Sequence, residues 1–234
     1  CLEIRKKEKE GGIAMPISEV YNMDCMEYMK GIPDNFFDLA VVDPPYGIDA
    51  AFTPCSRISK YGQTITANDN KPSKEYFDEL FRVSNNQIIF GYNHLSDMLP
   101  KCKEFIFWYK HQPVVSYADG ELAWTSFQKS AKCFDFPYFG NINAEKNRMH
   151  PMQKPIKLYS WIFKNYAKSG CKILDTHLGS GSSRIAAYKM GFDFYATEID
   201  KDYFEAQEER FRYECHGEIK TGKGTLVQTS LFGV

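Results

Sequence analysis

Residues 172–198 decide the fold, and they read KILDTHLGSGSSRIAAYKMGFDFYATE. The apolar run 172–175 predicts a buried strand with a carboxylate at its tip. A Gly-rich loop follows, and then a helical stretch, 184–190, that ends at Gly191. The run 192–197 predicts a second strand, which ends at Glu198. A strand, a loop, a helix and a strand in this order indicate an α/β protein with an open, mostly parallel, doubly wound sheet.

The Gly-rich loop has the chemistry of a nucleoside site. Its glycines let a ligand approach the backbone closely, and the N-terminus of the next helix favours a carboxylate or phosphate. An acid at the end of the second strand commonly holds ribose hydroxyls. Because the loop has an Asp and then Gly-Ser-Gly instead of GxGxxG, it favours a nucleoside with an amino-acid tail over a dinucleotide. S-adenosylmethionine is such a molecule, and its predicted contacts here are Asp175, Thr176, Gly179, Ser180, Gly181, Ser182 and Glu198.

A second polar tip follows the apolar run 37–42, which also predicts a buried strand. The tip consists of Asp43, Pro44, Pro45 and Tyr46. The prolines cannot extend a ladder, so they end the strand at the edge where α/β sheets bind ligands. The carboxylate and the Pro44 carbonyl can accept two N–H bonds from a ring-bound amino group while Tyr46 stacks on the ring. The alternative is a Pro-Pro turn that merely ends a strand.

These motifs resemble those of amino-methylating DNA methyltransferases of the β arrangement, in which Asp-Pro-Pro-Tyr precedes the Gly-rich loop. The resemblance covers residues 20–211 and implies a Rossmann-like fold. It places Asp24 and Cys25, ahead of the catalytic strand, near the cofactor adenine. It places Lys154, in the stretch His-Pro-Met-Gln-Lys-Pro at 150–155, near the methionine end of the cofactor. Thr176 and His177 depart from the Pro-Phe that is common in the family.

The resemblance implies methyl transfer from S-adenosylmethionine to an exocyclic amine of a flipped-out base in double-stranded DNA. An Asp at position 43 favours adenine N6, and cytosine N4 is the alternative. An RNA base methyltransferase and an inactive DNA-binding protein are further alternatives. No nuclease motif occurs in the sequence, so the enzyme is expected to be the modification partner of a restriction-modification system or a modification enzyme alone.

Composition agrees with a single medium-sized enzyme. The chain has 234 residues, 43% hydrophobic and 25% charged, with a formal net charge of −1. Seven cysteines show no CxxC pair, and five histidines show no i,i+4 pairing, so we expect reduced, buried thiols at Cys102, Cys133 and Cys171 and no metal. No apolar run is long enough to span a bilayer. We expect a cytoplasmic protein of a bacterial or phage-infected cell, either monomer or homodimer.

Charge is unevenly distributed along the chain. Residues 101–172 contain twelve Lys and Arg against five Asp and Glu, whereas residues 193–220 contain nine acids against four bases. This pattern predicts a one-sided, DNA-facing basic surface. Solvated helix faces are the alternative.

The domain organisation is simple. We expect a disordered leader at 1–14, a methyltransferase domain at 15–215 and a flexible tail at 216–234. Insertions near 48–73 and 127–149 are expected to recognise the target sequence. Helices are predicted at 75–83 and 200–211, and further strands at 87–90, 104–108 and 122–126.

The tail carries a separate motif. Gln228, Leu231 and Phe232 resemble the short Gln-x-x-Leu-Phe peptides that dock on the bacterial sliding clamp. Leu231 and Phe232 are adjacent apolar anchors, and Gln228 can fix the orientation. The alternative is that both apolar side chains pack on the enzyme's own surface.

Overall fold

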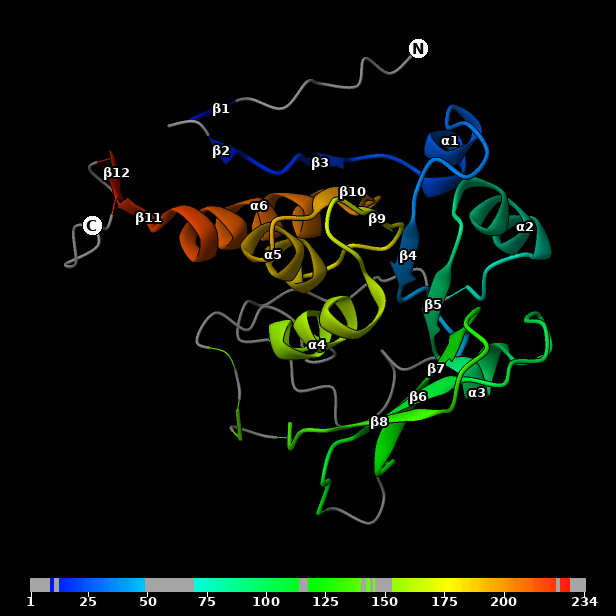
Figure 1. The fold of residues 1–234 in the computed structure, drawn as a ribbon. Helices are drawn as coiled ribbons and strands as arrows, with labels where there is room; N and C mark the ends of the chain where they lie inside the picture. The colour runs from blue at the N-terminus through cyan, green and yellow to red at the C-terminus, as the bar shows by residue number, and fades with distance from the viewer. Residues whose placement is uncertain are drawn as a thin grey trace.

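An eight-stranded sheet forms the centre of the molecule (Figure 1). The computed structural model describes residues 9–10, 13–48, 70–113, 118–139, 142–143, 145, 153–221 and 224–227. In spatial order the strands are β3 (Ser18–Tyr21), β10 (Asp193–Thr197), β9 (Lys172–Asp175), β4 (Leu39–Val42), β5 (Gln87–Phe90), β7 (Gly120–Thr125), β6 (Phe105–Tyr109) and β8 (Lys132–Asp135). All neighbours are parallel except β7, which is antiparallel to both β5 and β6. The predicted open, mostly parallel sheet is confirmed.

Helices cover both faces of this sheet because the strands are apolar on both sides. In β4, Leu39 and Val41 face one core, whereas Ala40 and Val42 face the other. The first core is closed by α4 (Ile156–Tyr166) and α5 (Ser182–Lys189), and the second by α1 (Cys25–Lys30) and α2 (Lys74–Val83). Helix α6 (Lys201–His216) packs beside α5. The fold is therefore doubly wound.

The chain order reverses between β4 and β9. From β4 the chain continues to β5 on one side and later returns through α4 to β9 on the other side. The carboxyl ends of parallel strands on either side of such a switch point leave a crevice for ligands. Asp43 follows β4 directly, and Asp175 ends β9, so the two polar tips lie on either side of this point.

Several element boundaries differ from the prediction. Strand β4 begins at Leu39 instead of residue 37, and α5 begins at Ser182 instead of residue 184. Helix α6 runs to His216, where Gly217 adopts a left-handed conformation (φ 65°) and ends it. Strand β3, helix α4 and the short helices α1 and α3 (Tyr92–Leu95) were not predicted.

Parts of the predicted leader and tail form short strands. Strands β1 (Lys9–Glu10) and β2 (Ile13–Ala14) pair within 1–14, and β11 (Glu218–Thr221) pairs with β12 (Gly224–Val227) within 216–234. Most of the predicted insertion at 48–73 and the motif at 228–232 lie outside the described residues. Strand β8 lies within the other insertion, 127–149. The expectation of a buried thiol is wrong for Cys133, which is exposed on β8, while Cys102 and Cys171 are half-buried.

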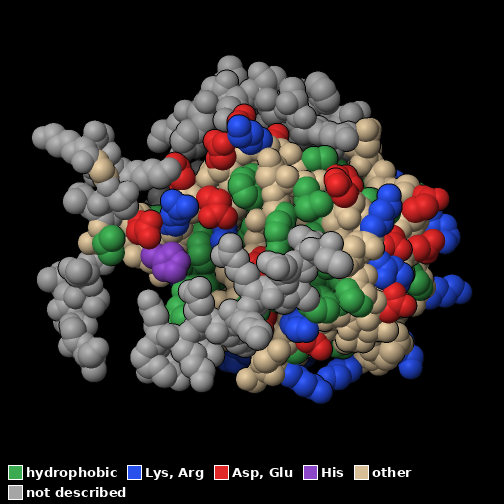
Figure 2. Space-filling model, turned by 90° about the horizontal axis from the view of Figure 1, so that it is seen from above, with side chains coloured by type: hydrophobic (Ala, Val, Ile, Leu, Met, Phe, Trp, Pro, Cys, Tyr) green, Lys and Arg blue, Asp and Glu red, His purple; other side chains and the backbone are tan. Residues whose placement is uncertain are grey.

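The basic stretch does not gather beside Asp43, which corrects the predicted DNA-facing surface. Seven of its lysines lie at the opposite edge, where β6, β8 and β9 begin and α4 ends: Lys101, Lys103, Lys129, Lys132, Lys164, Lys168 and Lys172. Glu104 ties this edge together, because it accepts hydrogen bonds from the Lys129 N–H (3.0 Å) and the Tyr166 hydroxyl (2.8 Å). On the face in Figure 2 the two signs of charge are interspersed over most of the surface.

Among the helices that the structure describes, none combines the length and apolar character needed to cross a membrane.

Candidate active site

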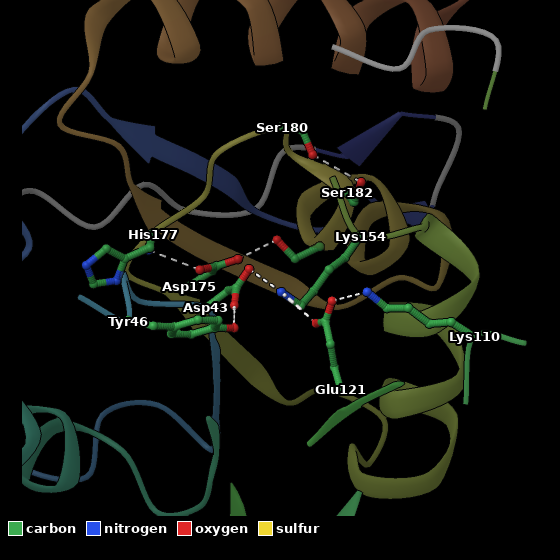
Figure 3. A network of polar contacts seen from close by, with 10 residues as sticks. Asp43, Tyr46, Lys110, Glu121, Lys154, Asp175, His177, Ser180 and Ser182 are labelled. Carbon is green, nitrogen blue, oxygen red and sulfur yellow. Dashed lines mark hydrogen bonds and ion pairs between the residues drawn. The ribbon is translucent and has the colours of Figure 1, made fainter. Parts of the chain in front are cut away.

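Asp43 lies at the carboxyl end of β4, with 28% of its side chain exposed. Strand β4 is buried on both faces, so the backbone at the tip is held by the core. One carboxylate oxygen, Oδ1, accepts a hydrogen bond from the Tyr46 hydroxyl, and the other, Oδ2, pairs with the Lys154 ammonium. Asp43 is thus fixed at both oxygens and still reaches the surface (Figure 3).

The ring of Tyr46 packs against α3. It stacks on His94, with ring centroids 5.4 Å apart and planes 18° from parallel. Gly91 precedes α3 with φ +76°, and a Cβ there would lie 2.1 Å from the Tyr46 ring. Only glycine permits this approach. Burial and the negative charges of Asp43 and Glu121 raise the pKa of Tyr46 well above its ordinary value, so its hydroxyl remains a donor.

Lys154 lies between two carboxylates. Its ammonium contacts Asp43 and lies 3.3 Å from Oε2 of Glu121, whose other oxygen pairs with Lys110. Burial alone would lower the pKa of Lys154, but the two carboxylates raise it. Burial alone would raise the pKa of Glu121, but the ammonium groups of Lys154 and Lys110 lower it to about 2. All four groups are therefore charged near neutral pH.

The Gly-rich loop begins at Asp175, the last residue of β9. Its carboxylate accepts hydrogen bonds from the Ser183 hydroxyl (2.6 Å) and the His177 N–H (3.1 Å). Burial raises the pKa of Asp175 to about 7 despite these bonds. The Thr176 hydroxyl contacts the Tyr76 hydroxyl (2.7 Å) and Nδ1 of His177 (2.9 Å). Burial lowers the pKa of His177 to about 4, so its ring is neutral at pH 7.

Arg210 of α6 holds the second half of the loop. Its guanidinium donates to the Ser180 carbonyl (2.6 Å) and the Ser182 hydroxyl (2.9 Å). Gly181 has φ +75° and faces Gln207, whereas a Cβ at Gly179 (φ +52°) would meet nothing within 4 Å. The backbone at Gly179 therefore faces open space.

Glu198, immediately after β10, closes the other side of that space. Its carboxylate accepts hydrogen bonds from the Gly179 N–H (2.7 Å) and the Asp200 N–H (2.9 Å). Burial raises its pKa despite these bonds. The next side chain, Ile199, is 67% exposed. A carboxylate and an exposed apolar side chain are thus adjacent beside the loop.

Asp24 and Cys25 lie next to this strand tip. Tyr21 at the end of β3 pairs with Thr197, and the Asn22 side chain donates to the Glu198 carbonyl (2.8 Å). The Asp24 carboxylate caps α1 by accepting from the Met26 and Glu27 N–H groups (2.9 and 3.0 Å). Burial, then the charge of Asp24, raises the pKa of the Cys25 thiol to about 12, so Cys25 is a neutral thiol.

The comparisons with known proteins agree with this geometry. The model of the N6/N4 methyltransferase family, described as DNA methylase, matches residues 83–209, just over half of the chain. This chain belongs to the DNA methylase family. The matched range includes Lys154, the Gly-rich loop and Glu198 of the methylase, and Asp43 precedes it.

Two curated relatives are type II methyltransferases. M.HpaI of Haemophilus parainfluenzae is 24% identical over 241 residues, which cover 83% of the methylase and 74% of M.HpaI. M2.MboI of Moraxella bovis is 22% identical over 236 residues, covering 82% and 86%.

Solved structures share the fold. The M1.HpyAVI–SAM complex has a TM-score of 0.57 at 23% identity and covers 82% of the methylase and 98% of that chain. The PvuII DNA methyltransferase, which is cytosine-N4-specific, has a TM-score of 0.58 at 13% identity, covering 85% and 88%.

The structure brings the predicted residues of the methylase to one edge of the sheet, and it adds residues that sequence reasoning missed. Glu121, Lys110, His94, Arg210 and Ile199 all contact or flank the predicted set. Glu121 was hidden because β7 is antiparallel, so its first residues lie at the edge where the parallel strands end. Ile199 had a signal, since an apolar residue directly follows the acid that ends β10.

Within the described part of the chain, no group of three or more His, Cys, Asp or Glu side chains could hold a metal ion.

Proposed function

We propose that this methylase transfers a methyl group from S-adenosylmethionine to the exocyclic N6 of adenine in DNA. The carboxylate of Asp43 carries the proposal, because it is exposed at a strand tip and lies across the switch point from the Gly-rich loop. A target amine bound at Asp43 and a methyl donor bound at the loop would therefore meet at one edge of the sheet.

The residues around Gly179 fit S-adenosylmethionine. The backbone there faces open space, the Glu198 carboxylate can accept from ribose hydroxyls, and exposed Ile199 offers an apolar surface for a purine. When bound, the cofactor supplies an electrophilic methyl group on a sulfonium. M1.HpyAVI and a DNA modification methylase of Thermus thermophilus, TTHA0409, are two similar proteins solved with this molecule.

The chain's own residues would then hold and polarise the target base. Asp43 and the Pro44 carbonyl accept the two N–H bonds of the amine, which favours a pyramidal nitrogen and stabilises the positive charge that develops on attack. A base can reach Asp43 only after it leaves the duplex, at a cost of a few kcal/mol. Because His94 stacks on one face of Tyr46, we expect the base to stack on the opposite face.

Adenine is the proposed target because position 43 is Asp, which in the resembled family usually accompanies N6 methylation. Cytosine N4 is the second candidate, since the fold is shared with a cytosine-N4-specific enzyme. We also propose, from the sequence motif, that residues 228–232 bind a sliding clamp.

Tritiated S-adenosylmethionine distinguishes these candidates. The methylase is incubated with duplex pools of random sequence that lack either adenine or cytosine in one strand, with hemimethylated and RNA controls. Transfer only where adenine is present supports N6, and transfer only where cytosine is present supports N4. Asp43→Asn is the matched inactive control, expected to bind the cofactor normally. Transfer to RNA alone, or cofactor binding without transfer to any substrate, would overturn the proposal.

A further inference from the structure

A chain of alternating charges extends from Asp43 into the antiparallel part of the sheet. Lys154 contacts Asp43, Glu121 lies beside Lys154, and Lys110 pairs with Glu121 (Figure 3). The hydroxyl of Tyr46 completes the chain at the other oxygen of Asp43. Of these five residues, only Asp43 and Tyr46 were predicted to act on the target base, and Glu121 and Lys110 have no role yet.

The burial of this chain explains why every member is needed. The side chain of Lys154 is only 6% exposed, and those of Lys110 and Glu121 are 21% and 23% exposed. A buried ammonium is costly unless carboxylates surround it, and two do so here. The four charges sum to zero. Removing one partner would leave a neighbour uncompensated.

Rigid parts of the fold hold these groups. Glu121 lies near the start of β7, where Trp108 pairs with it across the ladder to β6. The preceding Gly120 is packed so tightly that a Cβ would lie 2.1 Å from the Trp108 carbonyl oxygen. The Lys154 ammonium also lies over the ring of Phe90, 4.6 Å from its centroid. Lys154 therefore has one well-defined position between β4 and β7.

We propose that Glu121 is a positioning residue for methyl transfer: it holds the ammonium of Lys154, which in turn orients the Asp43 carboxylate toward the target amine. This inference rests on the proposed function. The physical need is clear, because a partly exposed carboxylate can rotate about its side-chain bonds, and a misplacement of about 1 Å can cost roughly 100-fold in rate. Tyr46 fixes Oδ1 and Lys154 fixes Oδ2, so loss of Glu121 should loosen the second of these restraints.

A double-mutant cycle tests the link between Glu121 and Lys154. The variants are Glu121→Gln, Lys154→Met and the double variant, and each is nearly isosteric with the residue it replaces. The matched control is Glu214→Gln, which breaks an ion pair of 3.2 Å with Lys189 on the opposite side of the Gly-rich loop's helix. For each protein we would measure kcat, KM for DNA, cofactor affinity by calorimetry and the unfolding temperature.

We expect Glu121→Gln to lower kcat about tenfold or more while both affinities change less than about twofold. In the Lys154→Met background the same substitution should change kcat less than about twofold, because its effect passes through Lys154. The Glu214→Gln control should retain wild-type kcat. A kcat of Glu121→Gln within twofold of wild type would overturn the inference, as would an equal loss in both backgrounds.

A spectroscopic readout keeps this test separate from the proposed function. In a ¹H–¹⁵N spectrum of lysine ammonium groups, the signal lost in Lys154→Met is that of Lys154. It should shift in Glu121→Gln and in Asp43→Asn but not in Glu214→Gln. If the wild type transferred no methyl group, the proposed function would fail, and these shifts would still support the link. An unmoved Lys154 signal in both variants would overturn it.

Discussion

Tyr46 has two separable interactions, one through its ring and one through its hydroxyl. The ring packs on His94 and Gly91, and the hydroxyl donates to Asp43. Tyr46→Ala removes both, and we expect a loss of about 1–3 kcal/mol of transition-state stabilisation on a paired target. The loss should be smaller on a mismatched target, because a mismatched base costs less to flip. Single-turnover kinetics on matched and mismatched duplexes measure the difference.

Tyr46→Phe is the control for the hydroxyl alone. It keeps the stacking ring and loses one hydrogen bond, so its defect should be about 1 kcal/mol and equal on both duplexes. If Tyr46→Ala showed the same defect on both duplexes, Tyr46 would not assist base flipping.

Asp175 gives a pH dependence of stability with a definite sign. Its pKa is about 7 in the folded protein and near 3.8 when unfolded. The stability that it contributes is fully present below pH 4 and is lost as the pH rises through 7, because the unfolded chain releases the proton first. The contribution amounts to a few kcal/mol at most.

Asp175→Asn should therefore flatten the free energy of unfolding between about pH 4.5 and 7.5, measured by urea denaturation without cofactor. The control is Asp78→Asn, an exposed carboxylate on α2 that pairs with Lys74. Its curve should run parallel to that of wild type. A wild-type curve whose pH slope is unaltered by Asp175→Asn would show that burial of Asp175 carries no such penalty.

Sequence reasoning reached the residues that local pattern exposes. Asp43 and Asp175 were found because each directly follows a short apolar run. Glu121 could not be found in this way, since its place beside Lys154 depends on β7 running antiparallel to β5. A residue whose role is set by strand order leaves no signature in its immediate neighbours.

The tip of β10 joins the Gly-rich loop to α6, and Glu198 makes the join. Its carboxylate accepts from Gly179 and Asp200, so it shapes the loop and can also accept from ribose hydroxyls. Glu198→Ala should weaken cofactor affinity by about 1–3 kcal/mol if both hydroxyls are held. DNA affinity without cofactor should change little. Isothermal calorimetry measures the first and fluorescence anisotropy the second.

Glu205→Ala supplies the matched control on α6. Its carboxylate is exposed and pairs only distantly with Lys201, at 3.7 Å, so cofactor affinity should be unchanged. An unchanged affinity in Glu198→Ala would instead identify Glu198 as an acid that only begins the helix.

At the level of elements, the buried strands were predictable and the edges were not. Strands β4, β5, β9 and β10 are continuous apolar runs, as expected of parallel strands covered on both faces. Edge strand β3 is half-buried and reads Ser-Glu-Val-Tyr, which has no such run. Helix α4 did carry a signal that the prediction overlooked, because its buried Leu158, Tyr159, Ile162 and Phe163 recur at helical spacing.

The distribution of charge over the whole molecule constrains how DNA can approach. Composition predicted a basic region, but position in the sequence does not determine position on the sheet. Because parallel strands begin at one edge and end at the other, lysines that precede β6, β8 and β9 lie far from Asp43. Lys110 and Lys154 do lie at the active edge, but they are neutralised by carboxylates. A weak general attraction for DNA near the site would make a tethering partner useful.

Residues 228–232 offer such a tether, and the proposed clamp contact can be tested with the whole protein. Docking on a sliding clamp would raise the effective concentration of the methylase on DNA by orders of magnitude without any new catalytic contact. We expect the full chain, and a fluorescent peptide of residues 223–234, to bind purified clamp with micromolar affinity. Leu231→Ala with Phe232→Ala should abolish binding because the apolar anchors are lost, whereas Thr229→Ala with Ser230→Ala should retain it. Both pairs of substitutions should leave methyl transfer on short duplexes unchanged. If neither chain nor peptide bound at high micromolar clamp, the motif would not be a clamp ligand, and a drop in unfolding temperature in the Leu231/Phe232 variant alone would favour packing on the enzyme's own surface.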